Sequence, residues 1–386
     1  MKKKKIILCV TATSMIAVTG AVLAINGGLK SLSAFATNAE VWYHYAAVAP
    51  TETTHGSKEF WASSSDGCAT HTFTDPGVTC VEHDFSTYDS FDSLSKDDDR
   101  YVANLNEQYG ITPVVREKTV IYGLYPQKNV NDSSLVSALD ALTTTESNGW
   151  YLYNNDYYAK VSASPYNSSC AFDNGTIIVS GTTYWFKCEP ITWDVLSDTN
   201  GEYYILSSVL LDARCYYDST GYRIIDGKTV YTSNYKYSDI RTWLNNYFYN
   251  SAFALNNSYI QVTTVDNSVS TTDTNSNSYA CANTEDKVFL PSYQDYINSS
   301  YGFSTSEDST DTRYCRTTDW ARARGAYSSM DDSSYLYNGY GSYWTRSPSS
   351  RYSGNVWLVD HNGCLDYSSN IVKFYSIRPA ITIKIA

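Results

Sequence analysis

Two Cys-x2-His pairs near the N-terminus form the residue pattern that comes closest to a defined chemistry. Cys68 and His71 make the first pair, Cys80 and His83 make the second, and eight residues separate the two pairs. Thiolates and imidazoles arranged in this way are ligands of tetrahedral Zn²⁺, and four protein ligands leave no position open for catalysis. The pattern therefore makes a structural zinc site one candidate for this segment. The alternative is a Cys68–Cys80 disulfide with exposed histidines, which an oxidising compartment would favour.

Residues 111–386 contain a single histidine, His361, as a candidate general base. It follows Asp360, and neighbouring residues of a strand face opposite sides of the sheet. We therefore expect that Asp360 does not orient His361 as the carboxylate of a catalytic triad does. Asn362 and Gly363 come next, and Asn-Gly is typical of a hairpin turn. The sequence thus predicts no catalytic residues here.

Acidic side chains gather in polar stretches of the C-terminal half. Asp331 and Asp332 are adjacent, as are Glu307 and Asp308. Glycosidases use two acids on opposite sides of a cleft, so an enzyme acting on cell-envelope polysaccharide is an alternative function. Acid-rich loops are more often solvated, or they bind Ca²⁺ weakly. Calcium therefore joins zinc as a candidate structural cofactor.

Aromatic residues alternate with Ser, Asn and Gly over residues 328–370. Rigid amphipathic rings among small polar residues are typical of binding surfaces, and such rings also stack on sugars. Four tyrosines that fall in expected loops are candidate ligand-binding residues: Tyr335, Tyr337, Tyr340 and Tyr352. Trp344 and Trp357 lie in period-two runs, so we expect both in the core.

Eight of the nine cysteines follow residue 36, and an even number in an exported chain permits disulfides. Close spacing makes Cys170–Cys188 the predicted local bridge, and buried free thiols are the alternative. The pairing of the last four cysteines stays open; these are Cys215, Cys281, Cys315 and Cys364.

The N-terminus reads as an export signal. Four lysines at positions 2–5 precede an uncharged apolar run over residues 6–25, and small residues around Ala36 suggest cleavage after it. The alternative is an uncleaved anchor, which would be the only membrane contact. The chain carries 28 basic and 40 acidic side chains, for a net charge of −12. Such a surface repels phosphate backbones, so we expect no nucleic-acid partner.

After residues 1–36, we expect a small His/Cys-containing module over 37–110 and a larger module over 115–386. The order of expected elements in the larger module indicates an α+β fold with antiparallel sheets, one clear helix and long loops. Ser238 is expected to cap that helix, whose apolar stripe comprises Ile240, Trp243, Leu244, Tyr247 and Phe248. Residues 268–283 are expected to form a polar loop that does not pack.

The other expected elements follow from turn, cap and breaker residues. They are a strand at 119–126 closed by Pro126, a short helix capped by Ser133 or Ser134, a hairpin at 154–156, strands at 176–179, 184–186, 191–196 and 202–206, short helices after Pro291 and Thr318, and a terminal strand at 381–385 that pairs near Val120.

Several motifs of the larger module occur in the order of a known family. They are Trp243-Leu244, residues 263–267, residues 287–291, Tyr343-Trp344-Thr345-Arg346-Ser347-Pro348 and Ile377-Arg378-Pro379-Ala380. With them, residues 115–386 resemble a bacterial family of domains of unknown function, number 6273. Arg346 and Arg378 match its Arg-Ser-Pro and Arg-Pro-Ala motifs. Buried arginines bonded to carboxylates or carbonyls would join the closing strands.

The resemblance implies a fold like that of C-type lectins and formylglycine-generating enzymes, although their calcium and cysteine motifs are missing here. Residues 55–61, His-Gly-Ser-Lys-Glu-Phe-Trp, resemble an opening found in other exported bacterial proteins. We expect a secreted or cell-surface, noncatalytic binding protein of a Gram-positive-like bacterium, with a glycan or a surface protein as ligand. A variable receptor of a diversity-generating retroelement is a further alternative, because such elements enrich Asn, Tyr and Ser codons.

Overall fold

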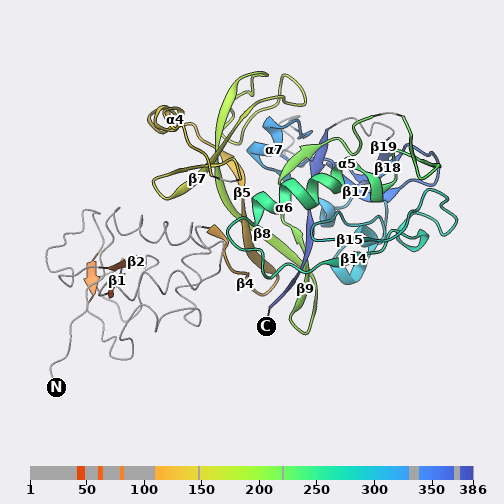
Figure 1. Ribbon diagram of the computed structural model, residues 1–386, viewed down its shortest axis with the longest axis horizontal. Coiled ribbons are helices and arrows are strands. Elements are labelled where there is room, and N and C mark those ends of the chain that lie inside the picture. Colours follow the sequence, from red (N-terminus) through yellow and green to blue (C-terminus); the bar gives the residue numbers. More distant parts are fainter. Residues whose placement is uncertain are drawn as a thin grey trace. The chain divides into compact units, whose positions relative to one another are not determined.

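The computed structural model describes the backbone of three short segments near the N-terminus and most of the chain from residue 109 on (Figure 1). The described ranges are 41–47, 60–63, 79–81, 109–146, 148–219, 221–329, 339–368 and 374–385. The chain divides into two compact units, residues 1–108 and 109–386. In the first unit, β1 (Val41–Ala47) pairs antiparallel with both β2 (Phe60–Ser63) and β3 (Thr79–Val81).

The second unit is built on a long antiparallel sheet in the order β21-β9-β8-β5-β4, with β7 on β8 and β6 on β7. Its strands are β4 (Val114–Val115), β5 (Thr119–Asn129), β6 (Tyr151–Tyr153), β7 (Asp156–Ser162), β8 (Thr183–Thr199), β9 (Glu202–Ser207) and β21 (Ala380–Lys384). The expected hairpin turn is confirmed, because Asn154 and Asn155 join β6 to β7 with φ of 46° and 64°. Two consecutive left-handed residues give the tight turn that matches strand twist.

Three expectations for this sheet are wrong. Strand β5 does not end at Pro126, because a register shift between Pro126 and Lys128 accommodates the proline within the strand. The two strands expected at 184–196 are one continuous strand, β8, and residues 176–179 contribute an isolated bridge at Ile177 instead of a strand. Strand β21 pairs with β9, and the β8–β9 hairpin places two strands between β21 and Val120 on β5.

A second sheet has the order β11-β20-β17-β18-β19, and its only parallel pair among these strands is β17–β20. Its strands are β11 (Asp212–Arg214), β17 (Tyr343–Pro348), β18 (Val356–Val359), β19 (Leu365–Ser368) and β20 (Tyr375–Ile377). Three small pairs complete the described strands: β10 (Val209–Leu210) with β16 (Arg316–Thr317), β12 (Arg223–Ile225) with β13 (Lys228–Val230), and β14 (Thr263–Val265) with β15 (Thr284–Asp286).

The helices are short. They are α4 (Ser133–Asp140), α5 (Asp239–Trp243), a π-helical turn (Leu244–Phe248), α6 (Tyr249–Ala252) and α7 (Asp319–Ala323), with 3-10 turns at Tyr235–Tyr237, Val269–Thr271, Asp295–Ile297, Ser299–Tyr301 and Asp311–Arg313. Among the residues that the structure describes, no helix has the length and apolarity to cross a membrane. Mixed sheets with few helices confirm the expected α+β class.

Most of the expected helix caps are confirmed. Ser238 caps α5, Thr318 caps α7, and Ser292 and Asp295 bond reciprocally as a capping box. The cap of α4 is Asp132, one residue before the expected serines, because its carboxylate accepts the Leu135 amide.

The helical segment 239–252 crosses the long sheet and packs on β5 through α6 (Figure 1). Its expected stripe is only partly packed: Ile240, Leu244 and Phe248 are buried, Trp243 is half-buried, and Tyr247 is 49% exposed. The π-helical turn explains the difference, because a wider turn carries the i+3 position off the packed face.

The core contains both tryptophans that the strand pattern predicts. Trp344 has no exposed surface and Trp357 is 6% exposed. The polar loop at 268–283 is better packed than expected: Thr272 and Asn277 are buried, and the Asn277 amide donates to the Pro348 carbonyl over 2.9 Å. Side-chain hydrogen bonds, which apolar patterning does not register, hold this loop in place.

Candidate functional site

Most residues proposed for the zinc and aromatic sites lie outside the described residues. This applies to Cys68, His71, His83, Tyr335 and Tyr337, while Cys80 lies on β3 with only its backbone described. The zinc site therefore stays a prediction. Among the described residues, no group of three or more His, Cys, Asp or Glu side chains is arranged to hold a metal ion.

The other two candidate tyrosines are described and differ in exposure. Tyr340 is half-buried, with its ring centroid 5.2 Å from that of Tyr314 and under the Arg316 guanidinium. Tyr352 is 61% exposed on the loop between β17 and β18. Tyr340 is thus held by neighbours within the chain, and Tyr352 presents a free ring face to solvent.

Arg346 and Arg378 are buried and bonded within the fold. Arg346 donates to the Leu290 carbonyl and to Asp295, each over 2.9 Å, and to the Asp266 carbonyl. Arg378 donates to the Ser207 carbonyl over 2.8 Å, to the Tyr343 hydroxyl, and to Asp194 over 3.0 Å. The bonds of Arg378 tie the chain after β20 to β8 and β9 of the long sheet, and those of Arg346 tie β17 to the segments around Asp266 and Leu290. Both arginines thus join the closing strands to other parts of the fold, in agreement with the role expected from their motifs.

The predicted Cys170–Cys188 bridge finds no support. Both cysteines are buried free thiols, and the four other described cysteines are also free. Burial raises the pKa of both thiols, so each acts as a small apolar side chain.

The expectation for Asp360 and His361 is wrong. Asp360 Oδ1 lies 3.0 Å from His361 Nδ1, and it also accepts the His361 amide and the Ser342 hydroxyl. The alternation argument fails because β18 ends at Val359, so both residues lie in the turn that Asn362 and Gly363 complete. The turn itself is confirmed. Ser342 donates to the carboxylate and not to the imidazole, so the three groups do not form a catalytic triad.

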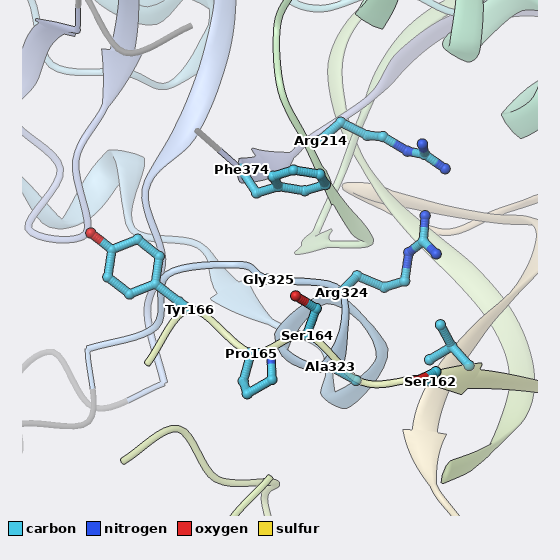
Figure 2. A pocket seen from close by; sticks show the side chains of 10 residues that line it. Ser162, Ser164, Pro165, Tyr166, Arg214, Ala323, Arg324, Gly325 and Phe374 are labelled. Atoms are coloured by element: carbon cyan, nitrogen blue, oxygen red, sulfur yellow. The ribbon is translucent and has the colours of Figure 1, made fainter. Parts of the chain in front are cut away.

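The described residues enclose a pocket of about 690 Å³, which we call the arginine pocket (Figure 2). Its lining comes from four separate segments: Val161, Ser162, Ser164, Pro165 and Tyr166 at and after the end of β7; Arg214 at the end of β11; Ala323, Arg324 and Gly325 at the end of α7; and Phe374 before β20. Strand pairing explains one juxtaposition, because Arg214 stands opposite Tyr375, the neighbour of Phe374.

Backbone contacts at the end of α7 set the shape of the pocket. The Ser164 amide donates to the Ala323 carbonyl over 2.8 Å, which attaches the first segment to the helix. Gly325 adopts φ of 103°, and a Cβ there would lie 3.1 Å from the Ser164 carbonyl and 3.4 Å from Phe374 Cβ. Glycine is therefore required where these three segments meet.

The Asp212 carboxylate stabilises the arginine side of the pocket. This buried carboxylate accepts the Tyr125 hydroxyl over 2.7 Å, the Trp320 indole N–H over 3.1 Å and the Arg324 Nε–H over 3.2 Å. Burial alone would raise the pKa of Asp212, but Arg324, Arg214 and these hydrogen bonds lower it, so the group is ionised. Asp212 in turn raises the pKa of Arg324.

An aromatic pair on the helical segment borders the two arginines. The Arg214 guanidinium carbon lies 4.9 Å from the Trp243 ring centroid, and Tyr247 stacks on Trp243 with centroids 6.1 Å apart. The Tyr247 phenol also contributes to the raised pKa of Arg324, after the larger contribution of Asp212. The π-helical turn that exposes Tyr247 thus places an aromatic pair, Trp243 and Tyr247, beside Arg214. Such turns are frequent at functional sites.

The sequence contains one signal for this pocket that composition alone does not reveal. Asp212 and Arg214 share one face of a strand that follows the apolar residues Val209, Leu210 and Leu211. A carboxylate in such a strand requires a cationic partner when it is buried. Arg214 is one such cation. The other, Arg324, follows a helix more than a hundred residues later in the chain, and nothing in the sequence links Arg324 to Asp212.

The fold and the pocket define an α+β domain with a cationic, aromatic-edged recess. Residues 201–385 match the model of a family described as a domain of unknown function (DUF6273). The matched region contains Arg214, Arg324 and Phe374, whereas the Ser162–Tyr166 wall precedes it. No curated protein and no solved structure matches the chain.

Proposed function

We propose that this protein is an exported, noncatalytic binding protein and that the arginine pocket binds a glycan. The observation that carries the proposal is the lining itself, which combines the exposed rings of Tyr166 and Phe374 with the hydroxyls of Ser162 and Ser164. Aromatic faces meet the C–H groups of sugar rings, and hydroxyls exchange hydrogen bonds with theirs. The volume lies in the range of pockets that enclose small ligands.

Figure 2 supports this arrangement, because the rings of Phe374 and Tyr166 lie on one side and the two guanidinium groups on the other. A ring seated against Phe374 would therefore face polar donors across the pocket. The likeness to C-type lectins and the export signal stay predictions that agree with this role. A protein ligand is the alternative outcome of the test below.

The test is a glycan array and whole-cell binding with the purified chain, with and without EDTA. We expect specific glycan binding that Phe374→Ala weakens about tenfold, because stacking of a ring contributes roughly 1–2 kcal/mol. Tyr222→Ala is the matched control, since Tyr222 is 65% exposed and does not line the pocket. Loss of affinity in both variants, or in neither, would contradict the assignment of the pocket. Binding to cells but not to any glycan would identify a protein ligand instead.

A further inference from the structure

The two guanidinium groups of the arginine pocket face a single carboxylate. Asp212 neutralises one positive charge, and the described residues that line the pocket include no acidic side chain. Arg324 Nε lies 3.2 Å from Asp212 Oδ1, and Arg214 follows Asp212 by two residues on β11 and lines the same pocket as Arg324. The side of the pocket formed by Arg214 and Arg324 therefore keeps a positive charge, although the net charge of the chain is −12. An anion is attracted to such a local cationic recess.

Arg214 also carries hydrogen-bonding capacity that the fold does not use. Its Nε is buried without a hydrogen-bond partner among the described residues, and the same holds for Trp243 Nε1. The Arg214 guanidinium lies over the Trp243 ring, so both buried donors belong to one small region. Buried donors are almost always paired in folded proteins, so these two mark a region whose hydrogen bonds the chain does not complete. Arg214 itself lines the pocket, and its terminal nitrogens have no hydrogen-bond partner among the described residues, so they are the donors that an acceptor in the pocket would meet.

We propose that the ligand carries a carboxylate on its sugar ring, so that the arginine pocket recognises an acidic sugar. This inference rests on the proposed glycan-binding function and names the class of glycan. The planar guanidinium fork matches a carboxylate in two parallel hydrogen bonds. The carboxylate binds at Arg214 and Arg324, the ring packs on Phe374, and the hydroxyls of Ser162 and Ser164 bond the remaining polar edge.

The test compares two probes that differ only in charge, an oligogalacturonide and its methyl ester, by calorimetric titration of the purified chain at low salt. We expect the free acid to bind at least about tenfold tighter, because hydrogen bonds to charged groups contribute roughly 1.5–3 kcal/mol. Arg214→Gln is expected to weaken binding of the acid far more than binding of the ester, so that the preference for the acid is lost.

Arg116→Gln is the matched control, because it makes the same charge change at an exposed position between β4 and β5. If Arg214→Gln fails to fold, Arg214→Lys keeps the charge and loses the fork, and a partial loss of the preference is expected. Equal binding of acid and ester would overturn the inference while leaving glycan binding intact. Tighter binding of a sulfated galactan oligosaccharide would assign the anion to a sulfate ester and overturn the carboxylate. Absence of any glycan binding would remove the proposed function as well.

Discussion

Two arginines at opposite ends of one strand pair differ in burial and in hydrogen bonding. In the pairing of β11 with β20, Asp212 stands opposite Ile377, next to Arg378, and Arg214 stands opposite Tyr375. Arg378 is 4% exposed and donates from Nε and both terminal nitrogens to groups within the chain. Arg214 is half-buried, and its Nε has no partner among the described residues.

The difference teaches that the role of a cation follows from its partners more than from its burial. A guanidinium whose donors are satisfied by carbonyls and carboxylates joins segments of the fold, and removing it leaves those acceptors buried and unpaired. A guanidinium that lines a pocket and has unused donors contributes to recognition, and removing it costs affinity instead of stability.

The largest effect should come from exchanging the arginines themselves for methionine. Arg378→Met is expected to lower the free energy of unfolding by about 4 kcal/mol, because it removes three hydrogen bonds of a buried guanidinium and leaves the Ser207 carbonyl without its donor. Arg214→Met is expected to change it by less than about 0.5 kcal/mol, as at other half-exposed positions. Urea unfolding of both variants measures the contrast, and equal losses would break the comparison.

A smaller effect is expected in the helical segment beside Arg214, where a buried residue can be compared with an exposed one. Leu244 has no exposed surface, and Leu244→Ala is expected to cost about 3 kcal/mol through the cavity it leaves. Tyr247→Ala, three residues later, is expected to leave stability nearly unchanged and to weaken ligand binding at the arginine pocket. A large loss of stability in Tyr247→Ala would mean that the π-helical turn does not separate a packed face from a binding face.

Local features of this fold could be predicted from sequence, because neighbouring residues determine them. Ser238 and Thr318 act as helix caps, Asn154 and Asn155 form a turn, and the Arg346 motif marks a buried cation. Each depends on side-chain chemistry within a few positions or on a motif shared with a family.

The arginine pocket could not be predicted, because its four wall segments (161–166, 214, 323–325 and 374) are far apart in the sequence and meet only through tertiary contacts. The exposure of Tyr247 also escaped prediction, since a π-helical turn has no apolar periodicity of its own. The contact between Asp360 and His361 escaped it for a related reason. Alternation of side chains applies inside a strand, and β18 ends one residue earlier.

The smallest expected effect concerns Asp360, another charged group whose partners lie within the chain. Burial alone would raise its pKa, but hydrogen bonds from His361 and Ser342 outweigh burial and lower the pKa to about 2. A carboxyl whose pKa falls on folding stabilises the native state above its unfolded pKa of roughly 4 and loses that contribution as the pH drops toward 2. Because the side chain is 36% exposed, screening reduces the contribution to about 1 kcal/mol.

The measurement is the difference in unfolding free energy between the native chain and Asp360→Asn, followed from pH 6 to pH 2. We expect this difference to shrink across the window, because protonation removes the charge that the variant lacks at every pH. Ser342→Ala removes one donor to the carboxylate, so its own difference should shrink over the same window. A difference independent of pH would mean that Asp360 stabilises the fold through packing and not through its charge. Asp360 would then differ from Arg378, whose charged group is bonded to partners within the chain.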